Sequence, residues 1–342
     1  MNGTGKILIT GAPGWLGSRL LALIEPLAIP EIRCLVHPSV DIAVLKGDHP
    51  HFQFFYGDIT DKASLGEFFE NARGAVLLHL AGIVHAQRRV REFFKVNTQG
   101  AKNILEWAIA GKVKRMVAIS SNAPAGTNAR ATGCFTEDSP YRPYRAYGQS
   151  KMEMEILLQN AHQKGDIETV VLRPCWFYGP GQPARQTLFF SLIKKGSVPV
   201  VGDGECKRSL SYVDDVCQAL LLAAKCPEAA GKIYWIADER PYSMNEIIRT
   251  VEGLLEGEFG IEVKHSVLRL PNWTGALAGF VDDRLQKAGV YHQKIHVLSE
   301  MNQTIACSVA KARRELDFRP SVGLEEGMRR SIRWCLENGV QI

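Results

Sequence analysis

The sequence predicts an α/β fold: a doubly wound parallel sheet of the Rossmann type, with a smaller, interleaved C-terminal substrate region. Short apolar runs alternate with helical segments over residues 1–175, and a glycine-rich turn joins the first run to the first helix. Continuous apolar strands separated by helices are typical of a parallel sheet covered on both faces. Ligands bind such sheets at the carboxyl ends of the strands.

The predicted strands are runs of Val, Ile, Leu and aromatic residues that close on Gly, Asp, Ser or Pro. They are Ile7–Thr10, Ile32–Val36, Phe52–Tyr56, Val76–Leu80, Met116–Ser120 and Thr169–Arg173. Helices are predicted between them near Trp15–Ile24, Ala63–Phe69, Arg91–Ala108 and Tyr147–Ala161.

Prolines and glycines cluster after Arg173, and the regular alternation ends there. We expect a helix at Asp214–Ala224 and a strand at Lys232–Ala237 to return to the sheet, and a last helix near Glu325–Leu336. The expected division is a dinucleotide-binding domain over residues 1–175, with returning elements near 210–240, and a substrate-binding region over residues 176–342.

Composition narrows the class of protein. The net charge is only +5, and the basic clusters are interleaved with glutamates, so they indicate solvated helix faces and not a nucleic-acid surface. The eight cysteines form no C-x-x-C pair, which indicates free, buried thiols in a reducing compartment. His292 and His296 stand four apart without the carboxylate that a zinc-hydrolase helix needs, so we expect no metal.

No targeting or membrane-spanning segment is expected. Residues 6–10 already fit the first strand, which leaves no room for a signal peptide. The apolar stretch Trp273–Val281 is too short to span a bilayer. The expected location is therefore cytoplasmic.

The first predicted strand leads into the pattern T-G-x-x-G-x-x-G at residues 10–17. Its glycines permit a tight turn and a close approach of the backbone to a pyrophosphate, and the helix N-terminus offers free N–H groups to the phosphates. In this strand–turn–helix context the pattern predicts a nicotinamide dinucleotide. The expected ligands are Gly11, Gly14, Trp15, Leu16 and Gly17.

The choice between NAD and NADP depends on the end of the second strand. An NAD site usually has Asp or Glu there to hold the ribose hydroxyls, whereas this strand ends at Val36 and His37. His37 can accommodate a 2′-phosphate, and Arg33 lies nearby in the sequence. The missing acid slightly favours NADP over NAD, and both stay open.

A tyrosine and a lysine four residues apart, Tyr147 and Lys151, share one face of a predicted helix. A nearby ammonium favours tyrosinate, so the phenol can exchange a proton near neutral pH. The alternative is an amphipathic helix with an exposed lysine. The fifth strand ends at Ser120 and Ser121, where a substrate carbonyl would lie; Ser121 is the favoured catalytic serine, although a serine there can also cap a turn.

Together these motifs resemble the extended short-chain dehydrogenase/reductases, the NAD-dependent epimerase/dehydratase family, over essentially the whole chain. The matching segments, in order, are T-G-x-x-G-x-x-G, Gly57-Asp58-Ile59, Leu80-Ala81-Gly82, Val96-Asn97-Thr98-Gln99-Gly100, Tyr147-x-x-x-Lys151, Leu172-Arg173-Pro174, Tyr178-Gly179-Pro180-Gly181, Gly202-Asp203-Gly204 and Tyr212-Val213-Asp214-Asp215-Val216. Some similarity to hydroxysteroid dehydrogenases accompanies them.

The resemblance implies roles for these residues. Tyr147 would be the general acid/base, Lys151 would lower its pKa and bind the nicotinamide ribose, and Ser121 would orient the reacting oxygen. Further cofactor contacts would come from Asp58, Ile59, Leu80, Ala81, Gly82 and Pro174. The implied activity is hydride transfer between a secondary alcohol or ketone and nicotinamide, in a homodimer paired through the helix that carries the tyrosine.

The substrate is a small molecule whose class stays open. Arg208 stands where nucleotide-sugar members hold a diphosphate, or it forms a salt bridge to Asp214 or Asp215. Trp176 replaces a common asparagine and suits an apolar, sterol-like ketone, or it packs in the core. Dehydration is not expected, because Asn122 and Ala123 stand where dehydratases have an acidic pair. Alternatives to a dehydrogenase are a nucleotide-sugar epimerase and a non-catalytic NADP(H)-binding sensor.

Overall fold

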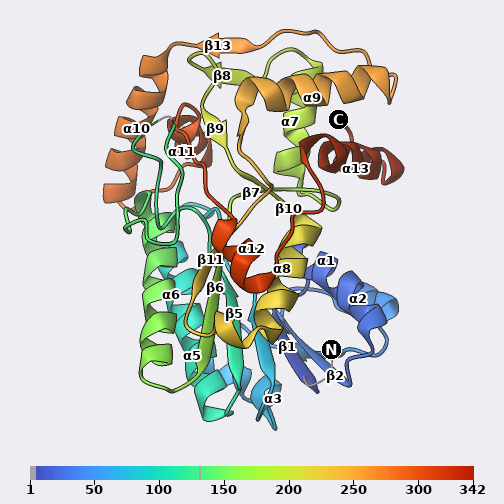
Figure 1. Cartoon of the computed structure of the whole chain (residues 1–342), viewed down its shortest axis with the longest axis vertical. Coiled ribbons are helices and arrows are strands. Elements are labelled where there is room, and N and C mark those ends of the chain that lie inside the picture. The colour runs from blue at the N-terminus through green and yellow to red at the C-terminus, as the bar shows by residue number, and fades with distance from the viewer. Residues whose placement is uncertain (1–4, 131) are drawn as a thin grey trace.

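A seven-stranded parallel sheet lies at the centre of the computed structural model, which describes residues 5–130 and 132–342 (Figure 1). The strand order is β11-β6-β5-β4-β1-β2-β3, and every neighbouring pair is parallel. The strands are β1 (Lys6–Thr10), β2 (Glu31–Val36), β3 (Gln53–Tyr56), β4 (Val76–His79), β5 (Arg115–Ile119), β6 (Glu168–Pro174) and β11 (Ile233–Ile236). The predicted Rossmann-type sheet is confirmed, with every strand end within one residue of its expected position.

Helices cover both faces of this sheet. Successive residues of β1 divide between two buried clusters, with Ile7 and Ile9 on one face and Leu8 on the other. The first face carries α1 (Trp15–Ile24), α8 (Val213–Lys225) and α12 (Ala310–Leu316); the second carries α3 (Gly66–Phe69), α5 (Ala101–Ala110) and α6 (Arg145–Gln163). A short helix, α2 (Ala43–Asp48), lies between β2 and β3 in the chain.

The helix predicted over residues 91–108 is not uniform. It begins as α4 (Arg91–Phe93), widens into a π-helical segment, η3 (Phe94–Gly100), and continues as α5. Asn97 in this segment accepts a hydrogen bond from the N–H of Ile83 (2.9 Å) and donates to its carbonyl (3.0 Å). π-Helical segments are frequent at functional sites. Here the widened turn fixes the loop that follows β4.

The remaining elements form an upper region above the sheet (Figure 1). Its strands pair as β7 (Trp176–Tyr178) with β10 (Leu210–Tyr212), β9 (Lys207–Arg208) with β12 (Tyr242–Ser243), and β8 (Pro199–Val201) with β13 (Leu268–Leu270). Its helices are α7 (Ala184–Lys194), α9 (Met244–Gly257), α10 (Asn272–Lys287), α11 (Gln293–Glu300) and α13 (Leu324–Glu337). Side chains from α7, α9 and α13 share one buried apolar cluster, which holds these three helices together.

Candidate active site

The glycine turn after β1 has the shape that a dinucleotide pyrophosphate requires. A Cβ on Gly17 would lie 2.2 Å from the Gly11 carbonyl oxygen, and Gly11 itself has φ +79°. A Cβ on Gly14 would instead meet only that same oxygen, at 3.2 Å, among the described residues. Helix α1 starts directly after Gly14 with no acidic residue in its first turn. The turn therefore leaves an open, positively polarised helix end that fits a phosphate group.

Trp15 has a structural role in addition to its expected one. Its indole Nε1 donates to the Pro180 carbonyl (2.7 Å), and its ring meets Phe177 edge-on. Only the backbone N–H of Trp15 therefore remains to bind a phosphate. The side chain fastens the glycine turn to the Tyr178-Gly179-Pro180-Gly181 segment of the upper region.

The predicted adenine-ribose residues lie at the ends of β2 and β3. His37 Nε2 is 3.7 Å from Asp58 Oδ2, and Asp58 also accepts from the N–H (2.8 Å) and hydroxyl (2.9 Å) of Thr60. Partial burial would raise the pKa of Asp58, but the Thr60 bonds and the His37 charge outweigh it and lower that pKa. The carbonyl of Ile59 accepts from Asn103 (2.8 Å), which holds this turn against η3 and α5.

Arg33 does not face this part of the site. Its guanidinium donates to Glu31 (2.7 Å) and to the Phe68 carbonyl (3.3 Å), and the residue is only 8% exposed. Although Arg33 is near His37 in the sequence, its donors serve groups at the start of β2 and the end of α3.

The segment after β4 lies beside Lys151, the lysine of the predicted catalytic pair. A Cβ on Gly82 would lie 3.2 Å from Lys151 Nζ and 3.1 Å from Asn97 Oδ1. The preceding Ala81 N–H donates to Thr10 Oγ1 (3.3 Å), which joins this segment to β1. The predicted stretch from Leu80 to Gly82 thus lies between the glycine turn and Lys151.

The structure brings Ser121, Tyr147 and Lys151 together at the end of β5 and the first turns of α6. Lys151 Nζ donates to the Ile119 carbonyl (3.0 Å), and the Ser121 hydroxyl acts on the Tyr147 phenol, working to lower its pKa. The hydroxyl of Ser121 also accepts from the Ala123 N–H (3.1 Å). Ser121 therefore closes a turn, as the alternative interpretation held, while it also contacts the tyrosine.

Burial controls the electrostatics of this trio. It raises the pKa of Tyr147 to about 12, against the smaller opposing effects of Ser121 and of the nearby Arg185 charge. It lowers the pKa of Lys151 to about 8, although the Glu155 charge works to raise it. The phenol is thus harder to ionise than free tyrosine, because burial outweighs the activation that the spacing predicts.

A buried charge cluster that the sequence analysis missed lies one helical turn beyond Lys151. Glu155 accepts from Ser120 Oγ (2.5 Å), from the Tyr141 hydroxyl (2.8 Å) and from Arg173 Nη2 (2.6 Å). Neither charged side chain is more than 2% exposed. The sequence signal that could have revealed this cluster is Glu155 itself, which stands four residues after Lys151 on the same helix. The hydroxyl of Ser120 is thereby bound inside the protein, so Ser121 is the serine at this strand end that acts on Tyr147.

Three more residues that no sequence pattern indicated surround Tyr147. His85 Nδ1 shares a hydrogen bond with the Tyr291 hydroxyl (2.6 Å), and burial lowers the pKa of His85 to about 4. The charge of Arg185, in the first turn of α7, acts on Tyr147, Tyr291 and His85 alike. His85 and Tyr291 come from two loops and Arg185 from the start of α7, so only the fold assembles these three residues.

The two candidate substrate residues lie in the upper region. Arg208 donates to the Glu300 carbonyl, whereas Asp214 is bound by Arg19 (2.8 Å) and Asp215 by Ser321. The salt-bridge interpretation of Arg208 is therefore wrong, because both aspartates are bound by other groups and the Arg208 guanidinium donates to a backbone carbonyl. Trp176 is half-buried and meets Phe189 edge-on, at 5.6 Å between ring centroids, which agrees with a packing role.

Comparison with known proteins adds three findings. The sequence model of the NAD dependent epimerase/dehydratase family matches residues 7–237. A Sinorhizobium fredii protein, y4nL, itself uncharacterized, is 45% identical over 97% of this chain and 96% of its own length. The Arabidopsis thaliana 3beta-hydroxysteroid-dehydrogenase/decarboxylase isoform 1 is 27% identical over 82% of this chain and 66% of its own.

Among solved structures, the dTDP-glucose 4,6-dehydratase DesIV from Streptomyces venezuelae, determined with NAD bound, is similar along the whole fold. The two chains are 25% identical, with a TM-score of 0.76 and 97% of each chain covered.

Proposed function

The chain belongs to the NAD dependent epimerase/dehydratase family, an extended short-chain dehydrogenase/reductase family, and on that premise we propose that it interconverts a secondary alcohol and a ketone by hydride transfer. The observation that carries this proposal is the meeting of Tyr147, Ser121 and Lys151 beside Gly82, at the carboxyl ends of β4 and β5. This is the edge of the sheet where a dinucleotide places its reactive ring.

When bound, a nicotinamide dinucleotide supplies the hydride acceptor or donor. The protein's own residues handle the proton. In the oxidative direction the substrate hydroxyl loses its proton to the Tyr147 oxygen as its carbon loses hydride; in the reductive direction Tyr147 returns the proton. Lys151, held by the Ile119 carbonyl, contributes positive charge that stabilises the tyrosinate, and Ser121 orients the substrate oxygen.

We do not propose dehydration. Elimination of water needs an acid and a base beside the substrate, and the residues after Ser121 are Asn122, Ala123 and Pro124. The backbone N–H of Ala123 is bound to Ser121 Oγ (3.1 Å), so this turn serves to position the serine.

A second candidate function is epimerisation of a nucleotide sugar through a transient ketone. Arg185 favours it, because its positive charge acts on Tyr147 and no carboxylate pairs with it among the described residues. An anionic substrate would supply that partner. An apolar ketone is favoured by the apolar character of Trp176 alone, since the contact of this ring with Phe189 agrees with a packing role. A cofactor-binding protein without turnover is less well supported, since the catalytic trio is complete.

One experiment separates these functions. The purified protein is incubated with NAD(H) or NADP(H) and with secondary alcohols or ketones of both classes, and reduced nicotinamide is followed by its absorbance. A dehydrogenase changes the absorbance in proportion to product. An epimerase interconverts the two sugar epimers with no net change. If neither product forms with either class, the proposed catalysis is wrong.

A further inference from the structure

Helix α10 directs its largest apolar side chains outward. Trp273, Leu277 and Phe280 are 63%, 53% and 58% exposed. Their spacing of four and three residues places them on one face of the helix. A surface helix normally turns such a stripe toward the core, so this arrangement is inverted.

The opposite face of α10 shows why the stripe stays outside. There the buried residues are Gly275, Ala278 and Asp282, and Asp282 is bound by His296 of α11 (2.9 Å). Arg145, at the start of α6, donates to the Gly279 carbonyl (2.6 Å). Because these polar contacts fix the helix, it cannot rotate its apolar stripe inward without breaking them.

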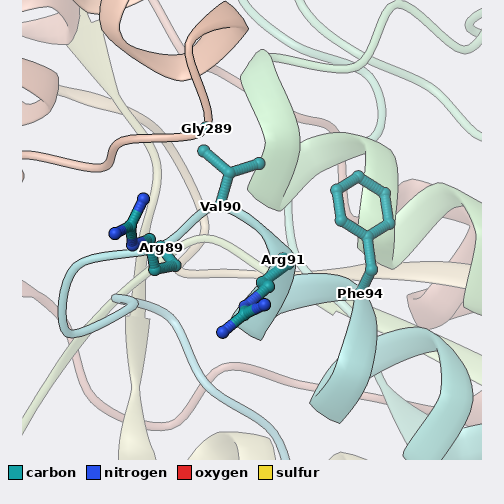
Figure 2. Close-up of a pocket in the computed structure, with 5 residues that line it drawn as sticks. All are labelled: Arg89, Val90, Arg91, Phe94 and Gly289. Carbon is teal, nitrogen blue, oxygen red and sulfur yellow. The ribbon is translucent and has the colours of Figure 1, made fainter.

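Positive charge flanks the stripe. Arg284 lies one turn after Phe280 with its guanidinium 5.0 Å from the ring centroid, and Gly289 follows the end of the helix. Gly289 lines a hollow together with Arg89 and Arg91 (Figure 2). Both arginines are exposed, and within the described part of the chain no carboxylate forms an ion pair with either. The stripe is therefore apolar along its length, with Arg284 at its C-terminal end and Arg89 and Arg91 around the hollow beyond that end of the helix.

We propose that α10 docks this protein on an anionic lipid surface, with the helix lying in the plane of the bilayer interface. Trp, Leu and Phe on one helix face, bordered by arginines, are the composition of interfacial helices. At 16 residues the helix is about 24 Å long. No helix in residues 5–130 and 132–342 is long and apolar enough to cross a membrane, so the proposed contact is peripheral.

Lipid fits the charge of this face better than a second copy of the chain does. Anionic headgroups neutralise Arg89, Arg91 and Arg284 together, whereas a second copy would bring further arginines to the same face. The docked helix would also hold the active site near the membrane, since Asp283 of α10 binds Arg145 (2.5 Å), two residues before Tyr147. The proposal concerns binding alone and does not depend on the proposed function.

The test is co-sedimentation of the full chain with vesicles of phosphatidylcholine and phosphatidylglycerol in equal parts, compared with phosphatidylcholine alone. We expect binding to the anionic vesicles that weakens with added salt. The triple variant Trp273→Gln, Leu277→Gln, Phe280→Gln should bind at least about tenfold more weakly. A second variant, Arg89→Gln with Arg91→Gln, should lose much of the preference for phosphatidylglycerol.

A matched control replaces exposed leucines elsewhere: Leu27→Gln with Leu336→Gln, at positions 40% and 43% exposed. This control should bind vesicles as the unaltered protein does. Nucleotide affinity, unchanged in all variants, verifies the fold. Absence of vesicle binding by the unaltered protein, or equal binding by the triple variant, overturns the proposal. The proposal is also overturned if the unaltered protein forms dimers in solution and the triple variant is monomeric, because the face is then an interface between copies.

Discussion

Glu155 of α6 holds Arg173 of β6 in a buried ion pair, with 2.6 Å between Oε2 and Nη2, one helical turn beyond Lys151. The pair connects α6 to the sheet, and Glu155 places a negative charge near Lys151. Burial alone would favour a neutral lysine, and the Glu155 charge opposes that effect. We infer that Glu155 is a positioning residue that keeps Lys151 protonated.

Replacing Glu155 by Gln should therefore narrow the pH range of activity. Without the glutamate charge, the pKa of Lys151 falls below its present value of about 8, so the lysine loses its proton at lower pH. The alkaline limb of the kcat profile should move to lower pH, while Glu155→Asp should largely restore it. The Gln variant should also lose about 3–5 kcal/mol of stability, because Arg173 is left buried and unpaired. An unchanged alkaline limb would show that Glu155 has only a structural role.

Tyr147→Phe should abolish turnover and leave nucleotide affinity nearly unchanged. In the proposed mechanism the phenol oxygen is the proton donor and acceptor, and loss of a general acid/base typically costs about 10²–10⁴ in rate. The measurements are kcat and the dissociation constant for the dinucleotide. Tyr144→Phe is the matched control: its hydroxyl binds Ser299 (2.7 Å), one turn away from the trio. Near-normal turnover in Tyr147→Phe would contradict the assignment.

Asp282→Ala should destabilise the α10–α11 pair. The carboxylate is fully buried and accepts from His296 Nδ1 (2.9 Å) and Gln286 Nε2 (2.9 Å), with Arg145 Nε 3.5 Å away. Its removal leaves these donors without a partner, at a cost of about 3–5 kcal/mol in the free energy of unfolding. Denaturant titration measures the loss. The control Asp283→Asn removes a neighbouring, more exposed carboxylate and should cost far less; equal losses would argue against a special role for Asp282.

The sequence predicted the sheet well because each strand is a continuous apolar run bounded by turn residues. Strand β1 and helix α1 follow from the glycine turn alone. Helix α10 shows the limit. Its periodicity indicates an apolar face, but the sequence does not show which face of the helix packs against the rest of the protein. In the structure the face that carries Gly275 and Asp282 is the buried one. The π-helical turn at Asn97 likewise depends on a bond to Ile83, a residue on another loop.

The residues of the candidate site likewise differ in whether the sequence alone could indicate them. Residues that lie on one helix or strand end, such as Tyr147, Lys151 and Ser121, can be paired by spacing. Arg185 reaches the same tyrosine from helix α7 and Tyr291 from the loop between α10 and α11, and no spacing in the sequence relates them. Arg208 could be found from its motif, but its hydrogen-bond partner could not. That partner is the Glu300 carbonyl, a backbone group that the sequence does not identify.

His37→Asp should shift the nucleotide preference toward NAD. His37 stands at the end of β2, 3.7 Å from Asp58, where an acid in NAD-binding members holds the ribose hydroxyls. Arg33 donates to Glu31 and to the Phe68 carbonyl, so His37 is the basic side chain at the end of β2 that can contact a 2′-phosphate. We propose that the unaltered protein binds NADP somewhat more tightly than NAD.

In His37→Asp the new carboxylate accepts from the ribose hydroxyls and repels a 2′-phosphate, so the affinity ratio should move toward NAD by about tenfold or more. Titration with each nucleotide gives the ratio, and His51→Asp, a histidine beyond α2 on an exposed loop, is the control for added charge. A strong NAD preference in the unaltered protein, or a ratio that His37→Asp leaves unchanged, would mean that β2 does not set the cofactor choice.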